Sequence, residues 1–257
     1  MMPNVSIIVT TYNRKDQLRE AIQAILNQTY QDFELIIVDN FSNYDFFDFI
    51  NEFKNEKIIP IQNNNKGIIA TNRNVGIQIA KGEYIAFCDD DDVWLQTKLS
   101  TQIDILNSNH FELVYCNTIL FFESGKEVIT NYKPTNTLNQ LLFTNHITTS
   151  SVVLKNNGNI NFIEDPNFTG IEDYELWLRM KILGYRFHLI SDSLVRFRVL
   201  NTSFSSSSRS KNEKKIIQLK KQLMQRKIKF SIANMVTIQF SLILSYIRLV
   251  ILLILKR

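Results

Sequence analysis

Apolar and polar positions alternate along the first ninety residues in two different periods. Short apolar runs rich in β-branched residues predict four strands, at residues 5–10, 33–38, 57–61 and 84–88. Between them, apolar residues recur at helical spacing over residues 15–27, 46–53 and 68–80. Alternating strands and helices are typical of a parallel sheet with helices on both faces. The pattern therefore predicts an α/β domain.

The second half of the chain is less regular. We expect helices at residues 95–107 and 172–183, and strands at 113–122, 127–132, 150–154, 186–190 and 194–199. Residues 156–169 are rich in Asn, Gly and Pro, which predicts a loop. The whole pattern predicts a mixed, mainly parallel sheet flanked by helices over residues 1–200, then a Ser-rich linker at 201–210 and a helical tail at 211–257.

Charge divides the chain at the same place. Residues 1–208 carry 17 Lys and Arg against 24 Asp and Glu, a net charge of −7, whereas residues 209–257 carry 12 against one, a net charge of +11. An acidic body argues against nucleic acid as its partner. The two cysteines, Cys88 and Cys116, lie in apolar stretches, so we expect free buried thiols rather than a disulfide framework or a zinc site.

The tail combines basic and apolar segments. Nine Lys and Arg fall within residues 209–229, and residues 230–255 are mostly apolar. Arg248 would be costly inside a membrane-spanning helix, so an interfacial helix or hairpin on the cytoplasmic leaflet is the preferred interpretation. A spanning anchor, and a helix packed on the body or on a second subunit, stay open as alternatives.

Polar residues follow three of the predicted strands, where parallel sheets bind ligands. They are the segment Thr10–Arg14, then Asp39, and then the run Asp89–Asp92. Four adjacent carboxylates repel one another and favour a hard divalent cation such as Mn²⁺ or Mg²⁺ as counter-charge. The alternative is a solvated acidic loop, and we expect Asp92 to cap a helix that starts near Trp94. Asp39 is suited to accept a hydrogen bond from the ring N–H of a nucleotide base. The alternative is an ordinary N-cap or turn aspartate.

Several motifs in order resemble glycosyltransferase family 2 over roughly residues 3–200. They are VSIIVTTYNR from residue 5, ELIIVDN from 34, NKG at 65–67, NRN at 72–74, GEYIAFCDDDDVW from 82 and EDYELWLR from 172. This resemblance implies a GT-A fold, a nucleotide-diphospho-sugar donor, with UDP-sugar preferred, and inversion at the anomeric carbon. One departure is Asn40-Phe41-Ser42, where the family often has a second acid or a small residue.

The resemblance also implies roles for individual residues on the donor side. Thr10, Tyr12 and Asp39 would line the base and ribose site, and Arg73 would steady the diphosphate. Within the acidic run, Asp91 would be the direct metal ligand with Asp89 in support, and Asp90 would face the sugar or ribose. The residues implied for donor binding are Thr10, Tyr12, Asp39, Arg73, Asp89 and Asp90. The residues implied for the metal are Asp91 and Asp89.

On the acceptor side, the resemblance implies that Asp173 is the general base. Inverting transfer is one displacement, so a carboxylate must take the proton of the attacking hydroxyl. The like charge of Glu172 would raise the pKa of Asp173, while the helix dipole would lower it. Ordinary first-turn helix chemistry is the alternative for both acids. Trp177 is read either as an acceptor-side sugar platform or as core, and Glu175 with Arg179 as a surface pair.

The sequence thus predicts an inverting, metal-dependent glycosyltransferase that acts in bacterial surface-polysaccharide assembly. We expect a glycan or lipid-linked acceptor and attachment to the cytoplasmic face of the membrane through the tail. One alternative is a sugar-nucleotide nucleotidyltransferase, which would usually show a Gly-rich loop after the first strand, and Thr10–Arg14 contains no glycine. The other is a catalytically silent, membrane-attached sugar-nucleotide binding protein.

Overall fold

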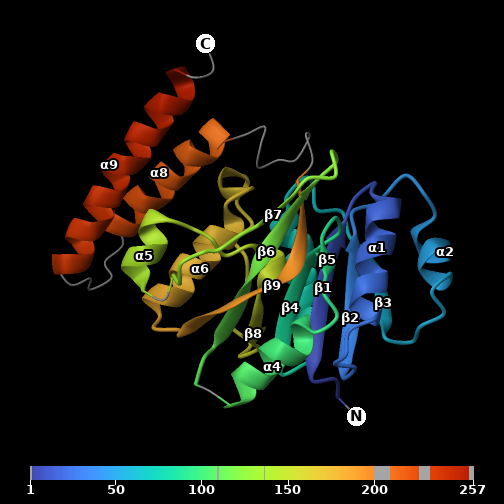
Figure 1. Ribbon diagram of the computed structural model, residues 1–257. Coiled ribbons are helices and arrows are strands. Elements are labelled where there is room, and N and C mark those ends of the chain that lie inside the picture. The colour runs from blue at the N-terminus through green and yellow to red at the C-terminus, as the bar shows by residue number, and fades with distance from the viewer. Residues whose placement is uncertain (1, 109, 136, 200–208, 226–231, 255–257) are drawn as a thin grey trace.

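The computed structural model describes residues 2–108, 110–135, 137–199, 209–225 and 232–254 (Figure 1). Its strands form one sheet in the order β3-β2-β1-β4-β8-β6-β9-β5, with β7 paired to β6. The strands are β1 Val5–Thr11, β2 Phe33–Asp39, β3 Ile58–Gln62, β4 Tyr84–Asp89, β5 Val93–Trp94, β6 Leu113–Phe122, β7 Glu127–Ile129, β8 Val153–Lys155 and β9 Phe187–Val199.

The sheet is parallel through its first four members and mixed beyond them. The strands β3, β2, β1 and β4 run parallel, and so do β6 and β9. The strand β8 is antiparallel to both β4 and β6, and therefore joins the two parallel groups. The predicted α/β class with a mixed, mainly parallel sheet is confirmed.

Helices cover both faces of this sheet, as Figure 1 shows. They are α1 Lys15–Leu26, α2 Phe46–Asn51, α3 Ile69–Ile79, α4 Lys98–Ser108, α5 Leu138–Phe143, α6 Glu172–Ile182, α8 Arg209–Gln225 and α9 Ile232–Ile254, with the short 3-10 turns η1 Thr149–Ser151 and η2 Pro166–Phe168. Alternation along β1 serves both layers: Ile7 and Val9 face the cluster that contains α1, and Ile8 faces the cluster that contains α6. Burial on both faces explains why the central strands are continuous apolar runs.

Several predicted elements differ in the structure; the strand expected at 150–154, for example, begins only at Val153, after the 3-10 turn η1. The strands expected at 186–190 and 194–199 form one strand, β9, because a bulge against β6 accommodates the residues between them: Cys116 pairs with Ile190 and Asn117 pairs with Ser193. The helix expected at 95–107 begins at Lys98, since Val93 and Trp94 pair with β9 as a two-residue strand.

The tail forms two helices that pack against each other, and α9 also packs against α5 (Figure 1). Of the predicted linker, residues 201–208 lie outside the described residues, and residues 209–210 already belong to α8. In α9, the segment Asn234–Leu252 is long and apolar enough to cross a membrane, by length and composition.

Candidate active site

Two adjoining pockets open at the carboxyl ends of the parallel strands. Thr10 pairs with Asp89, and Thr11 pairs with Asp39, so the ends of β1, β2 and β4 lie level. One pocket, here called the acidic pocket, has a volume of about 390 Å³ and includes Asp89–Asp91 and Asp173. The other, here called the strand-end pocket, has a volume of about 340 Å³ and lies beyond β1 and β2. The residues common to both are Thr10, Arg14, Ile69 and Asp90.

The acidic run forms a tight turn between β4 and β5. Asp90 is buried, and its carboxylate accepts hydrogen bonds from Thr11 Oγ1 at 2.8 Å and Arg14 Nη1 at 2.9 Å. Burial raises the pKa of Asp90 to about 6 against the opposing charge of Arg14. The Asp91 carboxylate pairs with the same Arg14 nitrogen at 2.8 Å, and burial, then the charge of Asp89, raise its pKa. Arg14 is thus a counter-charge for two of the four acids.

Contrary to our prediction, Asp92 does not cap a helix that starts near Trp94. Its side chain is fully buried, and Oδ1 accepts the backbone N–H of Arg198 at 3.0 Å. The expectation failed because β5 intervenes before α4, and Asp92 therefore joins the turn to β9 instead. Burial and the charges of Asp89 and Asp91 raise the pKa of Asp92 well above its usual range. Its Oδ2 has no hydrogen-bond partner.

The donor atoms in this turn fit a hard divalent cation. Asp90 and Asp91 converge on one cationic nitrogen of Arg14, so a cation at that position would meet oxygen from both carboxylates. Within the part of the chain that the structure describes, no group of three or more His, Cys, Asp or Glu is arranged to hold a metal on its own. Mg²⁺-type sites often use one or two carboxylates and take their remaining ligands from substrate phosphates. The residues therefore match a site completed by a donor diphosphate.

Arg73 joins the acidic run to the start of α6. It extends from α3, is buried, and pairs through Nη2 with Asp89 at 2.9 Å and through Nη1 with Glu172 at 2.7 Å. The carboxylates raise the pKa of Arg73 although burial opposes them. Glu172 also accepts the backbone N–H of Gly170. This network fixes segments that are separated by about a hundred residues of chain, since Arg73 and Glu172 lie 99 positions apart.

Asp173 is held in the wall of the acidic pocket next to this network. Burial, and then the charge of Glu172, raise its pKa to about 7, while Arg73 opposes the rise. Thr149 Oγ1 lies 3.4 Å from its Oδ2, and its Oδ1 accepts the N–H of Tyr174 at 2.6 Å. A carboxyl group with a pKa near neutrality can accept a proton at neutral pH and is suited to general-base work.

Of the residues expected to bind the nucleotide base, some line the strand-end pocket and one is buried in the core. Thr10 and the exposed Tyr12 line the strand-end pocket. Asp39 is fully buried, and its carboxylate accepts hydrogen bonds from Ser42 and from Gln62 Nε2 at 3.0 Å. The neighbour Asn40 lines this pocket in its place. Asp39 therefore organises the loop after β2.

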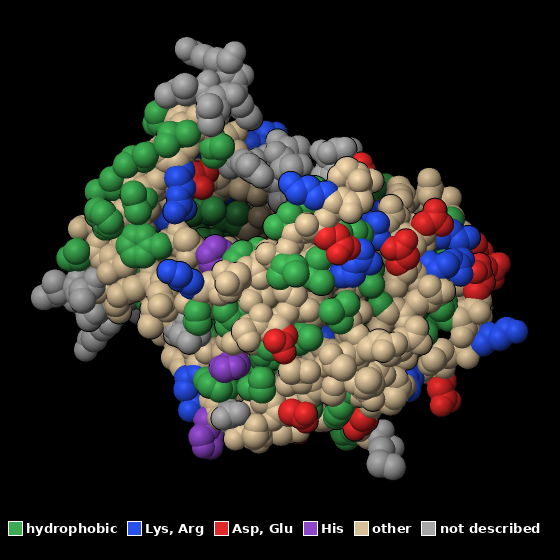
Figure 2. Space-filling view, in the orientation of Figure 1, with side chains coloured by type: hydrophobic (Ala, Val, Ile, Leu, Met, Phe, Trp, Pro, Cys, Tyr) green, Lys and Arg blue, Asp and Glu red, His purple; other side chains and the backbone are tan. Residues whose placement is uncertain are grey.

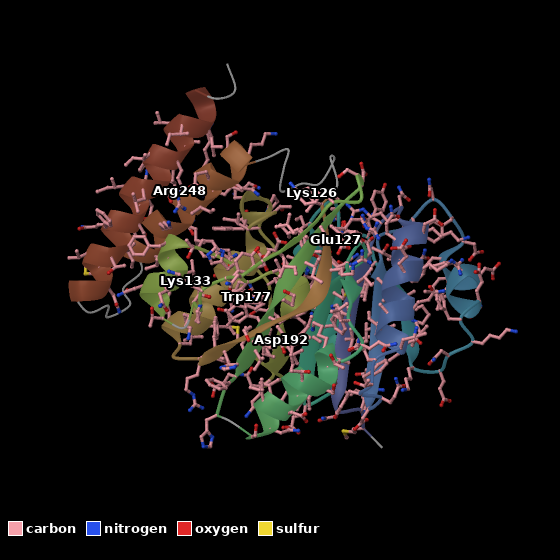
Figure 3. The ribbon with its side chains drawn as sticks, in the orientation of Figure 1. Lys126, Glu127, Lys133, Trp177, Asp192 and Arg248 are labelled. Carbon is pink, nitrogen blue, oxygen red and sulfur yellow. The ribbon has the colours of Figure 1, made fainter. Side chains whose placement is uncertain are left out.

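Trp177 lies in the core and not on the acceptor side. Its side chain is fully buried, faces Phe162 with ring centroids 6.5 Å apart, and lies inside the body of the domain in Figure 3. Of the two readings of Trp177, the structure supports the core, because the side chain is fully buried and is not among the residues that line the acidic pocket. The predicted pair of Glu175 and Arg179 forms at 3.2 Å, but with Glu175 buried rather than on the surface.

Sequence reasoning missed several residues of the acidic pocket. Arg14 stood inside a recognised motif without a role, although an arginine next to a strand end suits an acidic neighbour. Tyr132 was also overlooked; it stacks on His146, a residue that the sequence had suggested for acceptor contact, with ring centroids 4.5 Å apart and an interplanar angle of 10°, and both line this pocket. Asn212 of α8 also lines it and donates to the carbonyl of Gly170 at 3.3 Å. These contacts are brought together only by the tertiary fold.

Known glycosyltransferases resemble this chain in sequence. A family model described as glycosyl transferase family 2 matches residues 6–170. A β-1,3-glucosyltransferase of Escherichia coli, WfaP, is 35% identical over 213 residues, which cover 77% of this chain and 83% of that protein. A putative teichuronic acid biosynthesis glycosyltransferase of Bacillus subtilis, TuaG, is 25% identical over 80% of this chain and 82% of its own length. The chain belongs to glycosyltransferase family 2 and is a glycosyltransferase.

Solved structures show the same fold. Staphylococcus aureus TarS, residues 1–349, superposes with a TM-score of 0.73 at 18% identity, covering 95% of this chain and 71% of that one. The mannosyltransferase PcManGT of Pyrobaculum calidifontis, solved with GDP-Man and Mn²⁺, gives a TM-score of 0.67 at 17% identity over 88% of this chain and 65% of its own. The predicted GT-A fold is confirmed.

Proposed function

We propose that this glycosyltransferase moves a sugar, with inversion, from a UDP-sugar to a hydroxyl group of a lipid-linked or glycan acceptor in bacterial surface-polysaccharide assembly. The observation that carries the proposal is the convergence of Asp89–Asp91, Arg73 and Asp173 on one pocket of about 390 Å³. The donor is inferred from the family and from TarS, which was solved with UDP-GlcNAc. The lipid-linked acceptor is inferred from WfaP, whose name specifies a diphosphoundecaprenol-linked acceptor.

The two pockets fit the two halves of such a donor. We assign the nucleoside to the strand-end pocket, where Thr10 and Tyr12 lie, and the sugar to the acidic pocket. The diphosphate would then lie at their junction beside Asp90 and Arg14, which border both. Asp91 with Asp89, joined by Asp90 where it converges with Asp91, would hold Mn²⁺ or Mg²⁺, which when bound offsets the negative charge of the leaving diphosphate.

Asp173 would accept the proton of the attacking acceptor hydroxyl. The buried Arg73–Glu172 ion pair, at 2.7 Å, fixes the first turn of α6 and with it the direction of the Asp173 side chain. The charge of Glu172 keeps the proton affinity of Asp173 high enough for it to act as a base near neutral pH. In this proposal Glu172 is a positioning residue, and its own carboxylate is occupied by Arg73 and Gly170.

A donor screen tests this function. Hydrolysis and transfer would be measured for a panel of UDP-, GDP- and dTDP-sugars, with Mn²⁺, with Mg²⁺ and with excess chelator. We expect one class of UDP-sugar to be consumed, with turnover lost in chelator and restored by Mn²⁺. Full activity in chelator would refute the metal role of Asp91, and nucleotide binding without any turnover on any acceptor would support a silent binding protein. Family membership already argues against the nucleotidyltransferase.

We further propose that the tail attaches the enzyme to the membrane surface through one face of α9. The inner face is occupied: Ile238, Ser241 and Ser245 are buried against α8, and Lys220 of α8 donates to Ser245 Oγ at 2.9 Å. The outer face carries an exposed apolar stripe, visible along α9 in Figure 2, that consists of Val236, Phe240, Ile243, Ile247, Val250 and Ile251. Such a helix is suited to lie in the membrane interface.

The packing of α8 on α9 argues against a spanning anchor. A spanning α9 would take α8 into the hydrocarbon layer, and α8 includes Lys211, Lys214 and Lys221 as exposed residues. The same lysines suit the anionic headgroups, and Lys221 lies 5.4 Å from the ring centroid of the exposed Tyr246. Arg248, labelled on α9 in Figure 3, donates to the carbonyl of Phe143 at 3.0 Å and so stays at the protein surface. We propose the cytoplasmic face as the site of attachment by analogy with WfaP, whose name specifies a diphosphoundecaprenol-linked acceptor.

Vesicle flotation of the full chain tests the attachment. We expect binding to vesicles with anionic lipid, weaker binding to neutral vesicles, and release by high salt or alkaline carbonate. Ile243→Asp should abolish binding, whereas Ile129→Asp, at an exposed position on β7, should not. Resistance to carbonate would indicate a spanning helix instead. Failure to float, together with a dimer that Ile243→Asp dissociates, would assign the stripe to a second copy.

A further inference from the structure

Arg14 occupies the place where the two carboxylates best suited to a cation converge. A single nitrogen, Nη1, lies 2.9 Å from Asp90 Oδ1 and 2.8 Å from Asp91 Oδ2. The residue also borders both the acidic pocket and the strand-end pocket. The Arg14 guanidinium therefore lies at the junction where the proposed function puts the diphosphate. In the structure it is already paired with two carboxylates.

The backbone beneath Arg14 is fixed, while its side chain is accessible. Asn13 has a left-handed conformation with φ of 54°, its N–H donates to Ser42 Oγ at 2.8 Å, and its Oδ1 accepts the N–H of Asn43 at 2.7 Å. Arg14 itself precedes α1, and its side chain is 40% exposed. A guanidinium group on a fixed root with this exposure can change partners by rotation about its side-chain bonds alone.

The two acids would respond differently if Arg14 left. Asp90 keeps a hydrogen bond from Thr11 Oγ1 at 2.8 Å and is 6% exposed as a side chain, whereas the Asp91 side chain is 14% exposed and faces the same nitrogen. Without a cation, both carboxylates would stay close to Asp89 with less counter-charge, which is unfavourable. Arg14 and a divalent cation therefore compete for the same oxygens.

We propose that Arg14 is an exchangeable counter-ion: it pairs with Asp90 and Asp91 in the cation-free enzyme and turns to the donor diphosphate when these carboxylates bind a divalent cation. The inference rests on the proposed function, because it takes a cation and a nucleotide diphosphate as the ligands. Bidentate pairing with phosphate suits a guanidinium group and replaces the ion pairs that it gives up. With the cation alone bound, Arg14 would lack a counter-charge, whereas the empty and the doubly loaded states both provide one, so cation and donor would bind cooperatively.

The exchange predicts effects of opposite sign for one substitution. In Arg14→Gln the competitor is gone, so Mn²⁺ should bind about three- to ten-fold more tightly without nucleotide, the range that follows from an ion pair of this exposure. With Mn²⁺ saturating, UDP or the donor should bind about ten-fold more weakly, because a charge-assisted hydrogen bond to phosphate is lost. Damage to the pocket would instead weaken both.

The experiment is a Mn²⁺ titration of the full chain by isothermal calorimetry or by loss of the free-ion EPR signal, with and without UDP. Arg14→Lys keeps the charge and should restore the wild-type Mn²⁺ affinity. Arg19→Gln removes an exposed arginine one turn further along α1, paired with Glu52, and should change neither affinity. Melting temperatures of each variant with and without Mn²⁺ check that the proteins are folded.

The outcomes separate this inference from the proposed function. Tighter Mn²⁺ binding and weaker UDP binding in Arg14→Gln, absent from Arg19→Gln, support the exchange. If the wild-type chain binds Mn²⁺ and Arg14→Gln binds it with the same or lower affinity, the exchange is overturned and the proposed metal site still holds. No Mn²⁺ binding by the wild-type chain, with or without UDP, overturns the metal role in the proposed function and the exchange with it.

Discussion

Arg73→Met should destabilise the enzyme by an amount that depends on pH. The substitution keeps a long side chain but removes the charge that pairs with Asp89 and Glu172. Arg73 is 6% exposed and Glu172 is 7% exposed, so their ion pair is desolvated on both sides. Loss of the arginine leaves a buried carboxylate with its Gly170 hydrogen bond as the remaining direct support.

The magnitude follows from the burial of each partner. Breaking a buried ion pair by removing one partner typically costs about 3–5 kcal/mol. The Asp89 side chain is 29% exposed, and water can replace part of what it loses, which favours the lower end of that range. We therefore expect the free energy of unfolding to fall by about 3 kcal/mol at pH 8. The corresponding change at Arg19, whose pair with Glu52 is exposed on both sides, should cost a few tenths of a kcal/mol.

Urea unfolding at pH 8 and pH 5.5 measures how much unfolding free energy Arg73→Met loses and whether that loss depends on the ionisation of Asp173. Arg73 lowers the pKa of Asp173 toward its value of about 7, so without Arg73 this pKa rises further. A raised carboxyl pKa destabilises the folded state fully above that pKa, and the penalty declines as the pH falls toward the unfolded-state pKa. Below about pH 7 Asp173 is protonated in both folded proteins, so its contribution to the difference between them disappears. The deficit of Arg73→Met should therefore shrink at pH 5.5. A loss no larger than that of Arg19→Met, or one that is independent of pH, would refute the desolvated network.

Three further results are expected. Because the base must be deprotonated and the pKa of Asp173 is about 7, kcat/KM should fall about ten-fold per pH unit below neutrality and level off above it; a flat profile down to pH 5.5 would exclude Asp173 as base. Trp177→Ala should cost about 3–5 kcal/mol of stability, as for other buried tryptophans, without a selective rise in acceptor KM; a KM effect alone in a stable protein would return Trp177 to the acceptor side. Glu172→Gln should keep the fold but lower the pH at which activity is lost, since the charge that raises the pKa of Asp173 is gone; an unmoved profile would separate Glu172 from the base.

The periodic parts of the chain were the predictable ones. The runs that become β1, β2 and β4 are apolar because both faces of these strands are buried, and their polar ends then mark the edge where ligands bind. The family motifs predicted that Asp89, Asp90 and Asp173 belong to one site, and all three line the acidic pocket. The ends of these buried strands are local features, and the linear pattern of apolar and polar residues records them.

The errors have a common physical cause: partners distant in sequence. Asp92 and Trp94 were read as the start of a helix, but pairing of Val93 and Trp94 with β9, about a hundred residues away, makes that segment a strand. Trp177 stayed open between core and acceptor side, because its burial depends on packing against Phe162, which the motif does not show. Arg14 was overlooked because its role appears only when β4 places Asp90 and Asp91 beside it.

The central claim, that Asp173 serves as the base for transfer from a donor held in the same pocket, is tested most directly by single-turnover transfer with Asp173→Asn. The asparagine keeps the shape of the side chain but cannot take the proton. We expect UDP-sugar and Mn²⁺ affinities within about two-fold of wild type and a transfer rate lower by about 10²–10⁴-fold, the usual contribution of a general base. An Asp173→Asn enzyme that transfers sugar at the wild-type rate would contradict the claim.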